Sequence, residues 1–206
     1  MNVGMQAGPQ GPFPTGTVNQ QLRGGQLGDL VVSELQARYY EQTYRKNIFS
    51  AYCAAQATSV VGTAMVGLQL TNNSSTVNLV LLKCAGNIIV TSSTTTQIVL
   101  AAGTGQTSAP TSQTAATRAG SNFISGPTPQ GLATSLATFT NAPVAIWPLL
   151  HNTAAIATVG EDPGWLIDFE GAFIVPPNTY VAIAAGGAAV AAGGMNAGLM
   201  WTEVPV

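Results

Sequence analysis

The sequence is poor in charge. Of its 206 residues only 6 are Lys or Arg and 8 are Asp or Glu, so charged residues make up 7% of the chain, against roughly 25% in ordinary soluble proteins. The formal net charge of −2 gives little self-repulsion. Thr, Ser, Asn, Gln, Ala and Gly replace the missing charges, and such a surface has a low desolvation cost. We interpret it as a surface made to be covered by neighbouring subunits, or as a robust extracellular shell.

The few basic residues are dispersed along the chain. A nucleic-acid-binding surface normally concentrates Lys and Arg in one patch, so we expect no contact with a genome. The six positions are Arg23, Arg38, Arg45, Lys46, Lys83 and Arg118.

Signals for secretion and membrane insertion are lacking in the printed sequence. The first basic residue is Arg23, and the residues before it are rich in Pro and Gly rather than forming an apolar signal-peptide core. The apolar stretch 181–194 is mostly Ala and Gly, and no run reaches the roughly 18 apolar residues that span a bilayer. We therefore expect a protein that is made in a cytoplasm and does not enter membranes.

Residues that carry chemistry are equally scarce. Cys53 and Cys84 lie in apolar, strand-like contexts and are interpreted as buried free thiols, with a disulfide as the alternative. Together with His151, the single histidine, they are too few for a zinc site. No nucleophile lies at a spacing that would support His151 in a catalytic triad. We expect no catalytic residue, no metal and no cofactor.

Half of the acidic residues lie between Glu161 and Glu170. Asp168 and Glu170 are expected on one face of a strand, since side chains alternate. Together with Glu161 and Asp162 they could offer oxygen ligands to Ca²⁺. No EF-hand spacing appears, and a glycosidase carboxylate pair would have only Trp165 nearby as an aromatic platform. We therefore interpret the cluster as surface carboxylates.

The tryptophans are expected to pack in the core and at the sandwich ends: Trp147, Trp165 and Trp201.

From Asn47 onward the pattern is that of short strands separated by turn clusters such as 72–75 and 176–178. Many short strands without a long helix predict an all-β, jelly-roll-like antiparallel β-sandwich over residues 47–206. Residues 102–131, rich in Gly, Ser and Thr, are predicted to form a long projecting loop. The expected strands are 48–57, 63–70, 77–83, 88–90, 97–101, 132–140, 144–146, 155–158, 165–169, 173–175, 180–184 and 199–204.

Residues 1–46 are expected to form an extended N-terminal arm and contact segment. Residues 1–28 are rich in Pro and Gly and suit a strap docked along a partner. The spacing of Val32, Leu35 and Tyr39 predicts a short helix within 29–46, with an extended segment as the alternative. Tyr and Arg are enriched in protein interfaces, so we predict that this segment contacts a neighbouring subunit, with a solvated helix face as the alternative. The predicted interaction residues are Arg38, Tyr39, Tyr40, Tyr44 and Arg45.

Three stretches resemble the jelly-roll virion structural proteins of tailed bacteriophages, of the capsid decoration (cement) or fibre-tip type. "LQARYYEQTYRKNIF" (35–49) resembles their entry segment, and "GLQLTNNSSTVNLVLLK" (67–83) their first hairpin. "DFEGAFIVPPNTYVAI" and "LMWTEVPV", near the C-terminus, look like their closing strands. The resemblance covers roughly residues 29–206 and identifies no catalytic chemistry.

The resemblance implies a non-enzymatic capsid decoration protein on the surface of the virion. It would form homotrimers and contact the major capsid protein or other virion subunits. Two structural alternatives remain: a tail-fibre or receptor-binding tip with residues 102–131 directed at a host glycan, and a small single-jelly-roll coat protein. The coat alternative is disfavoured, because coats that package a genome often carry a basic arm and residues 1–28 contain only Arg23. An enzyme on the same scaffold is disfavoured because no catalytic constellation is present.

Overall fold

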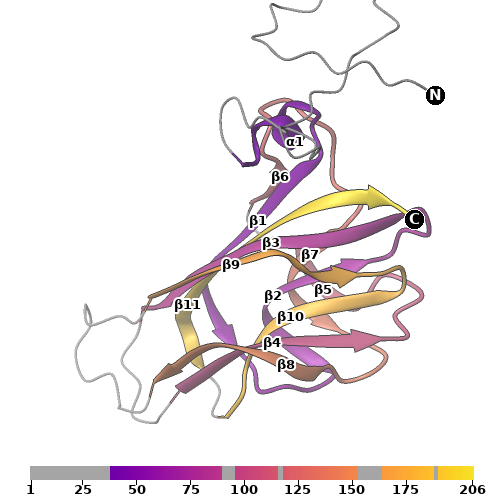
Figure 1. Ribbon diagram of the computed structural model, residues 1–206. Helices are drawn as coiled ribbons and strands as arrows, with labels where there is room; N and C mark the ends of the chain where they lie inside the picture. The colour runs from indigo at the N-terminus through magenta and orange to yellow at the C-terminus, as the bar shows by residue number, and fades with distance from the viewer. Residues whose placement is uncertain (1–37, 90–95, 116–117, 153–163, 188–189) are drawn as a thin grey trace, which may run out of the picture. The chain divides into compact units, whose positions relative to one another are not determined.

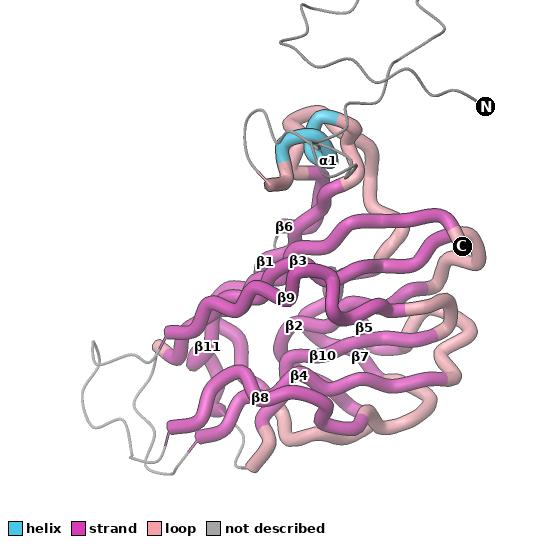
Figure 2. The backbone as a smooth tube through the Cα atoms, viewed as in Figure 1, coloured by secondary structure: helices cyan, strands magenta, loops and turns pink. Residues whose placement is uncertain are grey.

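The computed structural model describes residues 38–89, 96–115, 118–152, 164–187 and 190–206, and their regular secondary structure is almost entirely strand (Figures 1 and 2). The chain divides into two compact units, Met1–Glu41 and Gln42–Val206. A five-residue helix, α1 (Tyr40–Tyr44), lies within the segment 29–46 for which a short helix was expected, while Val32 and Leu35, whose spacing predicted it, lie outside the described residues. The predicted arm, residues 1–28, lies outside the described residues.

The described strands form two antiparallel sheets that pack as a sandwich (Figure 1). The five-stranded sheet contains, in spatial order, β6 (Arg118–Ser121), β1 (Ile48–Thr58), β11 (Val190–Pro205), β3 (Val77–Ile88) and β9 (Gly164–Val175). The six-stranded sheet contains β5 (Thr111–Ala115), β7 (Leu132–Thr138), β2 (Ala64–Asn72), β10 (Thr179–Ala185), β4 (Thr96–Thr104) and β8 (Val144–Asn152).

The pairing of the strands identifies the topology. β1 pairs with β11, β2 with β10, β3 with β9 and β4 with β8, always antiparallel. Once β5, β6 and β7 are set aside, the framework strands therefore pair first with last, second with second-last, and so on inward. This is the arrangement of a long hairpin wrapped into two sheets, which is the jelly roll. The expected all-β, jelly-roll-like sandwich is confirmed.

The predicted loop over 102–131 is wrong in part, because it contains β5 and β6. β5 pairs with β7 and β6 pairs with β1, so each extends one sheet at its edge. The described part of β5, from Thr111 to Thr114, is exposed. A strand without a buried face carries no alternation of apolar residues, which is the signal that strand prediction uses.

Two pairs of expected strands differ in extent from the structure. The runs 165–169 and 173–175 belong to one strand, β9, which bends where Glu170 and Gly171 adopt positive φ values of 50° and 84°. β3 likewise continues without a break from Val77 to Ile88. The strand expected at 155–158 lies outside the described residues.

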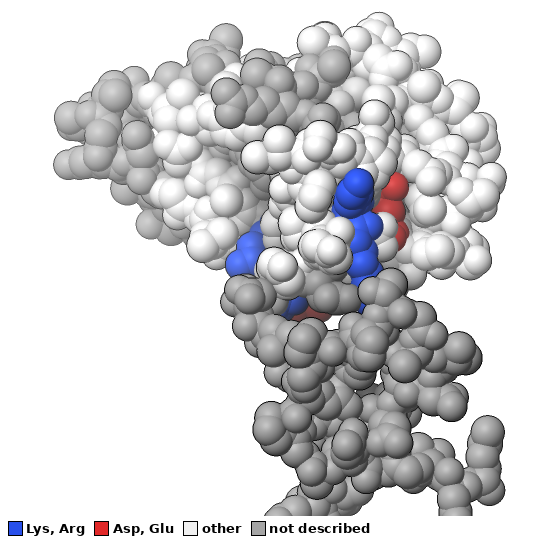
Figure 3. All heavy atoms as spheres, turned by 90° about the horizontal axis from the view of Figure 1, so that it is seen from above, with Lys and Arg blue, Asp and Glu red and all other residues white. Residues whose placement is uncertain are grey.

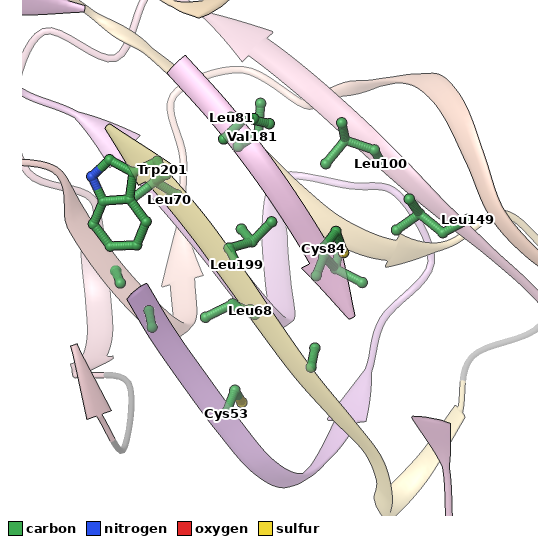
Figure 4. Packing of buried hydrophobic residues seen from close by; sticks show 14 of the residues in the cluster. Cys53, Leu68, Leu70, Leu81, Cys84, Leu100, Leu149, Val181, Leu199 and Trp201 are labelled. Carbon is green, nitrogen blue, oxygen red and sulfur yellow. The ribbon is translucent and has the colours of Figure 1, made fainter. Parts of the chain in front are cut away.

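The core lies between the two sheets (Figure 4). The five-stranded sheet contributes side chains such as Cys53, Leu199 and Trp201, and the six-stranded sheet faces them with residues such as Leu68 and Leu100. Cys53 and Cys84 are buried free thiols, as the sequence predicted.

The three tryptophans occupy different environments. Trp165 and Trp201 are buried, as expected, whereas Trp147 on the edge strand β8 is 48% exposed. Its ring packs edge-on against Phe173 of β9, with 5.8 Å between the ring centroids. Trp147 therefore joins the edges of the two sheets rather than filling the core.

Burial makes the stability of the fold sensitive to alkali. It raises the pKa of Cys53 and of Cys84 to about 11 and the pKa of Tyr180 to about 12, from ordinary values of 9.0 and 10.0. Raised pKa values favour the neutral groups in the folded state, so their contribution is complete below the ordinary pKa and is lost as the pH rises through the folded one. We expect the urea midpoint of unfolding to stay level up to about pH 9 and to fall between about pH 9 and 12.

The measurement is a series of urea titrations between pH 7 and pH 11. A Cys84→Ala variant is less stable at neutral pH, because it leaves a cavity, but its midpoint should decline less steeply above pH 9. A wild-type midpoint that stays constant up to pH 11 would contradict this account.

Candidate contact surface

Two of the carboxylates that the structure describes, Glu203 and Asp168, make contacts within the fold. Glu203 is buried, and its Oε1 accepts the backbone N–H groups of Gln130 (2.8 Å) and Gly131 (2.9 Å). The indole N–H of Trp201 lies 3.4 Å from the same oxygen. Through these hydrogen bonds, the carboxylate on β11 holds the end of the 102–131 segment, which contains β5 and β6.

The predicted acidic cluster is described only in part. Asp168 forms an ion pair with Lys83, with 3.3 Å between Nζ and Oδ2, and its Oδ1 accepts the backbone N–H of Glu170 at 3.1 Å. Glu161 and Asp162 lie outside the described residues. Over the described ranges, no group of three or more His, Cys, Asp and Glu side chains is placed to hold a metal ion. His151 lies on β8, but its side chain is not described.

The predicted contact residues are largely at the surface. Arg38 and Arg45 are exposed, Tyr39 is half-buried, and Tyr40 and Tyr44 expose 48% and 65% of their surface. The interface role predicted for these side chains requires such exposure.

The chain turns sharply from α1 into β1. The N–H of Asn47 donates to the carbonyl of Gln42 (3.0 Å), and the N–H of Lys46 donates to that of Thr43 (2.9 Å). Lys46 itself has a left-handed φ of 64°. These two bonds and the left-handed residue form a Schellman ending, which places Tyr44 and Arg45 immediately before the first strand of the sandwich.

The structure brings part of the predicted loop to the same place. β6 pairs with β1 from Phe49–Ser121 to Tyr52–Arg118, and two further bonds hold the residue after β6. The N–H of Asn122 donates to the carbonyl of Ile48 (2.9 Å), and the hydroxyl of Ser50 donates to Asn122 Oδ1 (2.6 Å). Two segments that are about 75 residues apart in sequence therefore meet at the start of β1.

The two segments carry a set of side chains that we call the end cluster, all of them exposed except the half-buried Phe123: Tyr44, Arg45, Lys46, Phe123 and Ile124. Lys46 Nζ lies 5.1 Å from the centre of the Phe123 ring, a cation–π contact. Ile124 is 91% exposed. Sequence reasoning missed Ile124; the only available signal was an adjacent Phe–Ile pair inside an otherwise small and polar segment.

The end cluster suits binding to another protein. Its aromatic and aliphatic side chains provide apolar area, and the two cations can bind carboxylates or carbonyl oxygens of a partner. The surrounding surface is almost uncharged: in the view of Figure 3, the blue and red side chains gather in one part of the described surface. No described helix is long and apolar enough to cross a membrane.

Comparison with known proteins supplies no relative. No family model, curated protein or solved structure matches the chain. The fold and the surface define the class: an all-β jelly-roll protein with an exposed end cluster. Any role must be argued from these features.

Proposed function

We propose that the chain is a non-enzymatic structural subunit of a bacteriophage particle, a capsid decoration (cement) protein that trimerises and stabilises the head. The observation that carries the proposal is an exposed apolar and cationic end cluster on a jelly roll whose sequence has only 7% charged residues. Jelly rolls also occur in lectins and cupins, so the fold alone does not specify this role.

The composition of the surface supports assembly. An isolated subunit with few charges and large exposed apolar side chains is poorly protected against association. In a particle the same surface is covered by neighbours, and a scarcity of charge reduces like-charge repulsion between repeated copies. The resemblance of residues 29–206 to phage virion proteins points to the same role.

The end cluster is the proposed contact with the head. Tyr44 is a rigid aromatic side chain that buries a large area at low entropic cost, and Ile124, at 91% exposure, has nearly its whole side chain available to a partner. Hot spots in interfaces typically lose 2 kcal/mol or more on truncation, about 30-fold in affinity.

The test uses phage particles assembled without this chain, to which the purified full chain is added back. We expect the wild-type chain to raise the temperature at which the heads rupture, and Tyr44→Ala and Ile124→Asp each to weaken rebinding by roughly 10- to 100-fold. Both variants should keep the thermal stability of the free protein, because the side chains are exposed.

The control variant is Val144→Asp, which places the same charge at a 70% exposed apolar residue of β8 outside the end cluster. It should rebind like the wild type. Heads that bind Tyr44→Ala and Ile124→Asp at full strength would overturn the contact. Electron cryo-microscopy that places the chain on the tail instead would replace the decoration role with the fibre-tip alternative.

A further inference from the structure

The segment 122–131, which carries Phe123 and Ile124 of the end cluster, is anchored at both of its ends. At its start, Asn122 is bonded to two residues of β1. At its end, residues 130 and 131 donate their backbone N–H groups to a single atom, the Oε1 of Glu203 on β11. The position of the segment between these anchors therefore depends on one side chain that is distant in sequence.

The second anchor also reaches the other part of the end cluster. The Glu203 side chain is buried, and its Oε1 lies 2.8 and 2.9 Å from the two backbone nitrogens. The backbone N–H of Glu203 donates to the carbonyl of Asn47 (3.3 Å), and Asn47 directly follows Lys46. Glu203 thus bonds both to the start of β1 and to the end of the segment that carries Phe123 and Ile124.

The backbone at this anchor is closely surrounded. A Cβ at Gly131 would lie 2.9 Å from Cδ1 of Leu79 and 3.2 Å from Cδ1 of Leu70, so the chain runs directly over core leucines. The side chain of Gln130 is held as well, because its Oε1 accepts the hydroxyl of Ser74 (2.6 Å). A buried N–H that loses its acceptor is costly, so removing the carboxylate favours conformations in which residues 130 and 131 leave this position.

The segment is stiff between its anchors. Pro127 and Pro129 each fix their own φ near −65° and restrict the residue before them. The N–H of Gly126 donates to the carbonyl of Phe123 (2.7 Å) and closes a turn. A short segment with so little internal freedom passes a displacement at one end on to the residues near the other end.

The end cluster depends on where this segment lies. Lys46 Nζ contacts the Phe123 ring across the two chain segments, at 5.1 Å from its centre. Ile124 is 91% exposed, so packing of its own side chain does not fix its direction, and its backbone must do so. A surface whose parts are held in place before binding loses less conformational entropy when a partner binds.

We infer that Glu203 is a positioning residue of the end cluster: by holding the N–H groups of Gln130 and Gly131, its carboxylate keeps Phe123 and Ile124 in the arrangement that a partner binds. The effect on binding rests on the proposed function. The effect on the segment does not, because it is measured on the free protein.

The test compares two variants of the full chain. Glu203→Leu removes the acceptor at similar side-chain size, and Glu203→Gln keeps an oxygen that can accept both N–H groups. In Glu203→Leu we expect hydrogen–deuterium exchange of peptides from 122–131 to be at least about 10-fold faster, and rebinding to phage heads to be about 10-fold weaker. Glu203→Gln should stay within about 3-fold of the wild type in both measurements.

A matched control separates position from stability. Gly86→Ala introduces strain at Trp165 and Asn196, away from the segment, so it should lower the stability of the fold yet keep wild-type exchange in 122–131 and wild-type rebinding. If Glu203→Leu does not fold, the double variant Pro127→Gly/Pro129→Gly takes its place, because it loosens the segment and leaves Glu203 intact. It should weaken rebinding at least about 3-fold.

Three results overturn the inference: unchanged exchange in Glu203→Leu, rebinding that Gly86→Ala loses as strongly as Glu203→Leu, or full rebinding by the double proline variant. Heads that do not bind the wild-type chain contradict the proposed function instead. The exchange measurement then decides by itself whether Glu203 holds the segment.

Discussion

A Gly86→Ala variant is expected to lose about 2–4 kcal/mol of unfolding free energy. A Cβ at Gly86 would lie 2.3 Å from Cζ2 of Trp165 and 2.5 Å from the carbonyl oxygen of Asn196. Trp165 is buried, and Asn196 belongs to the neighbouring strand β11, which pairs with β3 at this point. Neither neighbour can move without disturbing the core or the sheet, so the added methyl group strains both.

The matched control is Gly198→Ala, on the strand that pairs with β3. Its Cβ would make only ordinary contacts, at 3.6 Å and beyond. Replacing glycine at a compatible position stabilises by about 0.4–1 kcal/mol through the unfolded chain, so this variant should equal or slightly exceed the wild type. Urea unfolding at neutral pH compares the three proteins. Equal stability of Gly86→Ala and Gly198→Ala would show that Trp165 does not pack over Gly86.

An Asn72→Ala variant is expected to lose about 2–4 kcal/mol of unfolding free energy. Asn72 is fully buried. Its Nδ2 donates to the carbonyl oxygens of Val77 (2.9 Å) and Val175 (2.8 Å), and its Oδ1 accepts the N–H of Ser74 (3.1 Å). The side chain thus ties the turn between β2 and β3 to the end of β9. Truncation leaves buried carbonyl groups without their donor, and each such group costs about 1–3 kcal/mol.

The adjacent Asn73→Ala is the control. In the described structure the Oδ1 atom of Asn73 is buried and has no hydrogen-bond partner. Removing an unsatisfied polar atom has no bonding cost, so Asn73→Ala should stay within about 0.5 kcal/mol of the wild type or be more stable. Thermal and urea unfolding of the two variants test the difference. If both asparagines prove equally sensitive, the damage comes from the turn conformation and not from the three hydrogen bonds of Asn72.

The strands that the sequence predicted correctly are the buried ones. β10, with Tyr180 to Ala185 buried, and the strongly apolar β3 were located from composition alone, because a covered strand needs apolar side chains. β5 and β6 were missed because they extend sheet edges with small and polar residues. The bulge at Glu170 and Gly171 was read as a break, since a positive φ interrupts the pattern without ending the strand.

Only the part of the contact surface that precedes β1 could be predicted from the sequence. Tyr40, Tyr44 and Arg45 stand out in sequence because tyrosine and charge are scarce in the rest of the chain. Phe123 and Ile124 belong to it only because β6 pairs with β1, and that pairing has no local signal. The predicted role of these residues stays a prediction that the rebinding experiment tests.

By itself, the sequence determined the fold class, the buried thiols and the low charge, since these follow from composition and from alternation between near neighbours. Only the tertiary structure decided what depends on partners far away in the chain. Gly86 and Gly198 are alike in sequence, yet one faces a buried indole and the other an open hollow. Asn72 and Asn73 are adjacent, yet it is the side chain of Asn72 that donates to the carbonyl oxygens of Val77 and Val175. These differences arise because a sheet places each residue beside others that are many positions distant, and local patterns of residue type do not encode those neighbours.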